Sequence, residues 1–171
     1  MLLAALGGGC GSTPKHQNKP APPVPTPIGR GPEFIPAHVG TGQPPPASCS
    51  PGPLAGPIRI HLELFARRRA IVIHANIGVR RGCRYPLRTL TPTGVVELDR
   101  PGLTLGDFFD VWRMPLSRRR VLTFRGDVTA YVGGRRRDRD PRTIPLTDGA
   151  QIVLELGGFI PPHSFYLFPP R

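Results

Sequence analysis

Proline is concentrated in one stretch of this 171-residue chain, and that stretch decides how much of the chain can fold. Fourteen of the 24 prolines lie between positions 14 and 57. Proline has no backbone N–H to donate, and the stretch lacks the apolar periodicity needed to bury a core. We therefore predict a disordered, extended linker over residues 11–57. The folded domain is predicted over residues 58–171, which is close to the commonest domain size.

The first ten residues, MLLAALGGGC, resemble a bacterial lipoprotein leader with Cys10 as the lipidated residue. The apolar run is short and has no basic residue before it, which a start codon further upstream would explain. The predicted location is the outer face of the bacterial cytoplasmic membrane, lipid-anchored, or secreted. The alternative is the disordered N-terminus of a cytosolic protein. No later stretch has the 18 or so apolar residues of a membrane-spanning helix.

Two cysteines remain if Cys10 carries lipid, namely Cys49 and Cys83. Two cysteines in an oxidising compartment favour a disulfide between them. Two independent free thiols are the alternative. No Cys-x-x-Cys motif or Cys/His cluster predicts a structural zinc site.

Two segments at the start of the domain alternate apolar and polar residues, as half-buried strands do. In the first, Ile58, Ile60, Leu62 and Leu64 share one face, while Arg59, His61 and Glu63 share the other. The second is AIVIHANI, with Ile71, Ile73 and Ile77 facing inward. A two-residue Arg67–Arg68 turn would pair Ala66 with Arg69 and place His61 opposite His74, both pointing away from the apolar face. Arginine is unfavourable in such a turn, so a longer loop stays open.

The rest of the domain reads as a short strand, one helix and several further strands. TPTGVVELD predicts the strand, and Leu105, Phe108, Phe109 and Trp112 form one helical stripe. Thr104 is the expected helix cap, with Asp107 three residues on, and Pro115 prevents continuation. RVLTF, VTAYV, IPL and QIVLEL follow, with RRRDRDPRT as a loop and a proline-broken apolar tail across the surface.

This order predicts an α+β fold with one helix packed on a mixed sheet. The closing IPLTDGAQIVLEL resembles the end of ubiquitin-like β-grasp domains, and that fold is the first expectation. A small β-sandwich with one helix is the alternative.

Most of residues 49–168 resembles a family of poorly characterised exported or membrane-anchored bacterial proteins. The matching pieces are Cys49, IHLELF, ANIGV, CRY, TPTGVVELDRP, TLGDFFDVWRMPLS, VTAYVGG and IPLTDGAQIVLEL. Members of that family carry His-x-His in the first strand, His-Thr-His after Cys-x-Tyr, and a histidine at the end of the next strand, which suggests metal binding. This chain has Arg59, Arg88, Leu90 and Glu97 at four of those positions. The resemblance therefore supports fold, export and the Cys49–Cys83 bond, and argues against a retained metal site. His61, His74 and Glu63 remain weak metal candidates, and no cofactor is predicted.

The predicted domain holds 20 arginines and ten acidic residues, a net charge of 20 − 10 = +10. Such a surface favours anionic partners, although arginine enrichment from a GC-rich genome is a competing explanation. Aromatic residues do not alternate with these charges, which argues against a nucleic-acid binder of the stacking type. The candidate anion-binding residues form three runs: Arg67, Arg68, Arg69; Arg118, Arg119, Arg120; and Arg135, Arg136, Arg137.

No motif of a known hydrolase, nucleotide-binding loop or metalloprotease is present, and the few acidic residues are scattered. The chain is therefore predicted to be a non-enzymatic binding or interaction protein of the cell envelope, tethered by lipid. A degenerate zinc- or copper-binding envelope protein is the second expectation, and a basic nucleic-acid-binding protein is the third.

Overall fold

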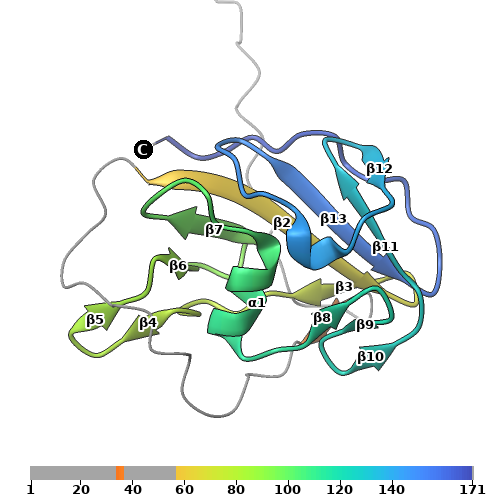
Figure 1. Ribbon diagram of the computed structural model, residues 1–171, viewed down its shortest axis with the longest axis horizontal. Helices are drawn as coiled ribbons and strands as arrows, with labels where there is room; N and C mark the ends of the chain where they lie inside the picture. The colour runs from red at the N-terminus through yellow and green to blue at the C-terminus, as the bar shows by residue number, and fades with distance from the viewer. Residues whose placement is uncertain (1–33, 37–56, 171) are drawn as a thin grey trace, which may run out of the picture.

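The computed structural model describes residues 34–36 and 57–170 (Figure 1). These residues form one α-helix, one 3-10 helix and short strands grouped in three sheets. The predicted α+β class is confirmed in this coarse form: one helix on a largely mixed sheet. The strands of the described residues are β1 (Phe34–Pro36), β2 (Ile58–Ala66), β3 (Arg69–Val72), β4 (Val79–Arg80), β5 (Cys83–Arg84), β6 (Leu87–Arg88), β7 (Val95–Leu98), β8 (Leu116–Ser117), β9 (Arg120–Val121), β10 (Phe124–Arg125), β11 (Val128–Val132), β12 (Arg135–Arg137) and β13 (Gln151–Leu156).

The main sheet has the order β1-β3-β2-β13-β11-β12, with β7 and β6 attached beside the first half of β2. β2 is antiparallel to β3 and parallel to β13, and β13 is antiparallel to β11. Along one edge β2 changes partner: Ile58 to His61 pair with β7, and Leu64 to Ala66 pair with β3. β2 and β13 therefore form the centre of the domain.

The helix α1 (Leu105–Trp112) begins at the predicted residue. The Thr104 side chain accepts from the Asp107 backbone N–H, and Asp107 accepts from the Thr104 backbone N–H at 2.8 Å, so the two form a capping box. Leu105, Phe108, Phe109 and Trp112 are all buried, as the stripe predicts. They pack with Ile60, Leu62 and Leu64 of β2 in one core, so α1 covers one face of the sheet (Figure 1).

The β2–β3 turn has two residues, which is one of the two loop lengths that the sequence left open, and the histidine pairing expected from it does not form. Arg67 and Arg68 both adopt positive φ, 51° and 64°, in a two-residue turn, and Ala66 pairs with Arg69. The β2–β3 ladder ends at Leu64 and Ile71, however, so the predicted pairing of His61 with His74 does not form. His61 lies opposite Val95 of β7 instead, because β7 takes over this edge of β2.

Two segments expected to lack regular structure are strands. Arg135–Arg137, predicted as part of a loop, forms β12 and pairs with β11 at the edge of the sheet. Phe34–Pro36, inside the predicted linker, forms β1 and pairs in parallel with β3. An edge position tolerates proline because its missing N–H faces outward. Residues 1–33 and 37–56, which carry the rest of the linker prediction and the leader, lie outside the described residues.

Candidate functional site

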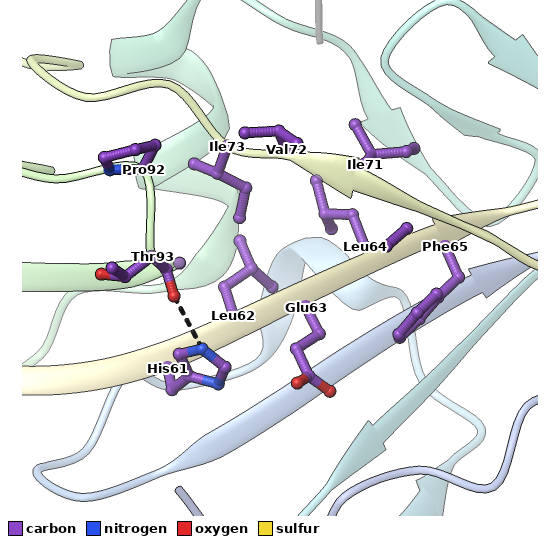
Figure 2. Close-up of a pocket in the computed structure, with 12 residues that line it drawn as sticks. His61, Leu62, Glu63, Leu64, Phe65, Ile71, Val72, Ile73, Pro92 and Thr93 are labelled. Carbon is purple, nitrogen blue, oxygen red and sulfur yellow. Dashed lines mark hydrogen bonds between the residues drawn. The ribbon is translucent and has the colours of Figure 1, made fainter. Parts of the chain in front are cut away.

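His61 on β2 contacts β13, the loop before β7 and the C-terminal segment, and it is buried rather than exposed. Only 4% of its surface is accessible. Its Nδ1 lies 2.7 Å from Gln151 Oε1 on β13, and its Nε2 lies 2.8 Å from the Thr93 carbonyl oxygen before β7. Figure 2 shows the ring on the face of β2 opposite Leu62 and Leu64, with its bond to Thr93. The prediction of a solvent-exposed histidine pair is therefore wrong.

The C-terminal segment, residues 157–170, is what buries His61. Tyr166 stacks on the imidazole with ring centroids 3.7 Å apart and planes 8° from parallel. Nη1 of Arg59 donates to the Pro169 carbonyl at 2.9 Å, and His163 Nδ1 lies 2.9 Å from Glu63 Oε1. The whole polar face of β2 thus contacts this segment. The apolar, proline-broken composition of the tail indicated that it would lie across the surface, but no sequence pattern showed which residues it would cover.

The protonation state of His61 is coupled to the orientation of the Gln151 amide. Burial lowers the pKa of His61, against the opposing effects of the Gln151 hydrogen bond and the Glu63 charge. A neutral ring that donates from Nε2 to Thr93 must accept at Nδ1, so the Gln151 amide nitrogen has to face the ring. A protonated ring donates from both nitrogens, and Gln151 Oε1 then faces it. In that orientation Gln151 Nε2 is buried without a partner among the described residues.

This lowered pKa predicts a pH dependence of stability. The unfolded chain takes up the proton near the ordinary pKa of 6.5, whereas the folded chain does so only at lower pH. The His61 contribution to stability is therefore present above pH 6.5 and is lost as pH falls through the window below it. Urea unfolding at a series of pH values should show the advantage of wild type over His61→Gln shrinking from pH 7.5 to pH 5.5. A difference that stays constant or grows on acidification would contradict the buried neutral histidine.

A groove of about 860 Å³ lies beside His61, between β7, the loop before it and the C-terminal segment. Its sheet side presents Arg59, Glu63 and Glu97, and its rim carries Leu90, Phe165 and Leu167. These three apolar side chains are 44%, 69% and 75% exposed. The groove can receive a small ligand or a side chain, with a charged floor and an apolar rim.

Arg59, Arg88 and Glu97 meet where β2, β7 and β6 pair, and Arg59 and Glu97 line this groove. β2 pairs Arg59 with Glu97 of β7, and β6 pairs Arg88 with the same Glu97. Arg88 donates from Nε and Nη2 to Glu97 Oε2 at 3.0 and 2.9 Å. Arg88 is 3% exposed and Glu97 is 18% exposed, so the pair is largely buried. A largely buried arginine–carboxylate pair therefore lies beside the groove.

The metal candidates are not gathered into a ligand set. Glu63 contacts His163 rather than a second buried histidine. His74 follows the end of β3, and its carbonyl accepts from Thr89. Within residues 34–36 and 57–170, no group of three or more His, Cys, Asp or Glu side chains is placed to hold a metal ion.

The arginine runs are a second candidate site, and strand pairing brings two of them to one end of the sheet. Arg67 N donates to the Leu156 carbonyl at 2.8 Å, Leu156 pairs with Val128, and Val128 N donates to the Arg118 carbonyl at 2.8 Å. The row Arg67, Leu156, Val128, Arg118 crosses three strand spacings, or about 15 Å. We call this surface the arginine end; its members are Arg67, Arg68, Arg118 and Arg119, flanked by Arg69, Arg120 and Arg137.

Of the third arginine run, Arg135–Arg137 on β12, only Arg137 lies beside the arginine end. Arg137 pairs with Ala130, and Arg118 Nη2 donates to the neighbouring Asp138 carbonyl at 3.1 Å. Arg135 pairs with Val132, four residues along β11 from Val128 and so about 13 Å away. Arg135 and Arg136 therefore lie outside the arginine end.

Within the part of the chain that the structure describes, few carboxylates neutralise the arginine end. Asp127 Oδ1 is 3.8 Å from Arg119 Nε, but the two side chains are 90% and 84% exposed, so the pair contributes little. Glu155 is buried below the surface and accepts from the Ile160 N–H at 3.2 Å. The arginines Arg67, Arg68, Arg118 and Arg119 are all exposed, and their positive field is available to an anionic partner.

The chain matched no protein-family model, no curated protein and no solved structure. The residues that the structure describes contain no helix long and apolar enough to cross a bilayer. Cys83 lies on β5 and is disulfide-bonded, whereas Cys10 and Cys49 lie outside the described residues. The Cys49–Cys83 pairing and the lipidation of Cys10 stay predictions.

Proposed function

We propose that this chain is a non-enzymatic binding domain of the cell envelope that holds an anionic partner at the arginine end. The observation that carries the proposal is the hydrogen-bonded row from Arg67 to Arg118. It brings two arginine runs, 51 positions apart in sequence, to one surface where the described residues offer little acidic compensation. Arginine presents a fork of N–H donors that suits phosphate groups.

The topology supports a β-grasp-like fold as part of this proposal. A β2–β3 hairpin is followed by a helix across the sheet, and the last strand, β13, lies parallel to β2 in the centre. That arrangement is typical of β-grasp domains, and β6, β7 and β12 are additions to it.

Export and a lipid tether at Cys10 complete the proposal. Their support is the leader-like sequence before the proline-rich segment and the disulfide at Cys83, because disulfides persist mainly in oxidising compartments. The degenerate metal-binding alternative is less favoured, because Arg59, Arg88 and Glu97 stand at sequence positions where the family that this chain resembles carries histidines, and Arg88 and Glu97 pair with each other.

Anion binding is tested with fluorescently labelled inorganic polyphosphate. The variant Arg67→Gln/Arg118→Gln/Arg119→Gln should bind at least about tenfold more weakly than wild type, because three lost contacts of about 0.5 kcal/mol each amount to that factor. The matched control removes the same charge elsewhere: Arg80→Gln/Arg81→Gln/Arg100→Gln. Arg80 and Arg81 are exposed on the β4–β5 hairpin, far from β8 and β9 in Figure 1.

The control variant should stay within about twofold of wild type at the same salt concentration. Equal weakening in both variants would mean that net charge alone drives the binding, and the proposed site would be wrong. No polyphosphate binding by the wild-type chain would also reject it.

A further inference from the structure

One exposed large apolar side chain lies beside the arginine end. Phe159 follows β13 in the sequence and is 64% exposed. The other exposed large apolar residues of the described chain, Leu90, Phe165 and Leu167, all line the groove beside His61. Phe159 is thus separate from the groove and needs a different explanation.

The turn that carries Phe159 is fixed on both sides. Before it, the Leu156 carbonyl accepts from Arg67 N, and Gly157 and Gly158 turn the chain with φ of 72° and 150°. After it, Ile160 N donates to Glu155 Oε1 at 3.2 Å. A side chain at Gly158 would collide with Arg68, because an added Cβ would lie 2.7 Å from Arg68 Cγ. The turn therefore lies directly against the two arginines of the β2–β3 turn.

A preorganised phenylalanine among exposed arginines matches the chemistry of a membrane surface. Anionic headgroups attract arginines through their phosphates, and an adjacent phenylalanine gains by entering the boundary with the acyl chains. A soluble phosphate polymer offers the arginines the same charge but offers the phenylalanine nothing apolar. The combination therefore favours a bilayer over a soluble polyanion.

We propose that the arginine end docks on an anionic phospholipid bilayer, with Phe159 inserted between headgroups. This inference rests on the proposed function and names its partner. It gives the tethered domain a fixed orientation, with the sheet end carrying the β2–β3 and β8–β9 turns toward the lipid and the groove beside His61 on another part of the molecule.

The test uses the full chain carrying Cys10→Ser, so that no lipid anchor contributes, and vesicle sedimentation. Vesicles containing phosphatidylglycerol should bind the protein, and pure phosphatidylcholine vesicles should not. Phe159→Ser should weaken vesicle binding roughly tenfold, because an inserted phenylalanine side chain is transferred from water to an apolar region. Phe159→Leu should stay within about twofold of wild type, since leucine inserts as well. Polyphosphate binding should be the same in all three proteins.

The remaining outcomes distinguish the membrane inference from the proposed anion-binding function. If polyphosphate binds and depends on the three arginines, but phosphatidylglycerol vesicles do not bind, the membrane inference is wrong and the proposed function stands. If Phe159→Leu loses vesicle binding as fully as Phe159→Ser, and both variants lose binding to single-stranded DNA to the same extent, the phenylalanine stacks on bases and the partner is nucleic acid. If neither polyphosphate nor vesicles bind, both proposals fall.

Discussion

Replacing Glu97 with alanine is expected to lower the free energy of unfolding by about 3 kcal/mol, measured by urea denaturation at neutral pH. The substitution leaves the Arg88 guanidinium charged and buried with no carboxylate beside it. The expected loss is at the lower end for a buried pair, because Glu97 keeps 18% of its surface exposed. Glu97→Gln should lose somewhat less, since the amide oxygen still accepts a hydrogen bond from Arg88.

Two controls separate this explanation from simple loss of packing. The exposed pair of Arg136 and Asp138, with atoms 3.2 Å apart, offers the same chemistry in water, so Asp138→Ala should cost less than about 1 kcal/mol. The double variant Arg88→Met/Glu97→Leu removes both charges and should recover most of the loss. A double variant as unstable as Glu97→Ala would show that packing, not the unpaired charge, sets the cost.

Replacing Gly78 with alanine should destabilise the domain strongly. Gly78 has φ of 70°, and a Cβ there would overlap the Leu87 carbonyl oxygen and lie 3.1 Å from Val111 of the helix. The left-handed backbone alone costs about 1–2 kcal/mol for alanine, and the overlap forces β6 away from its position. Because a domain of this kind is stable by only about 5–15 kcal/mol, the variant should lose several degrees of melting temperature or fail to fold.

Gly82 provides the matched control for this prediction. Its φ is 76°, nearly the same, but an added Cβ would meet no atom within 4 Å. Gly82→Ala should therefore cost only the backbone term, about 1–2 kcal/mol. Equal losses in the two variants, by thermal denaturation followed with circular dichroism, would contradict the close approach of β6 to Gly78.

Local patterns predicted the elements whose partners lie nearby in sequence. The alternation of Ile60, Leu62 and Leu64 and the stripe of Phe108 and Trp112 report directly which face is buried, and both predictions are confirmed. The sequence left the β2–β3 connection open between a two-residue turn and a longer loop, because arginine is unfavourable at positive φ, and the two-residue turn forms. Here the strands on each side fix the register, so the turn takes the conformation that they require.

The surroundings of His61 were not predictable because they depend on distant segments. Polar residues at every second position normally mark a solvent-exposed face of a strand. Nothing in the sequence of β2 indicates that residues 157–170 will cover this face. Gln151 and Thr93, the two partners of His61, lie 90 and 32 residues away. The strand β12 was missed because an arginine triplet has no alternation of apolar and polar residues to mark a strand. Pairing with β11 makes Arg135–Arg137 extended.

The central claim is that strand pairing gathers two arginine runs into one anion-binding surface. The most direct measurement is a titration of the 15N-labelled protein with inorganic polyphosphate, followed by amide chemical shifts. We expect the shifted signals to cluster at residues 67–69, 118–120 and 157–159, which are far apart in sequence and meet only in this fold. Shifts clustered at Leu90, Glu97 and the C-terminal residues around the groove, or spread evenly over every exposed arginine, would contradict the claim.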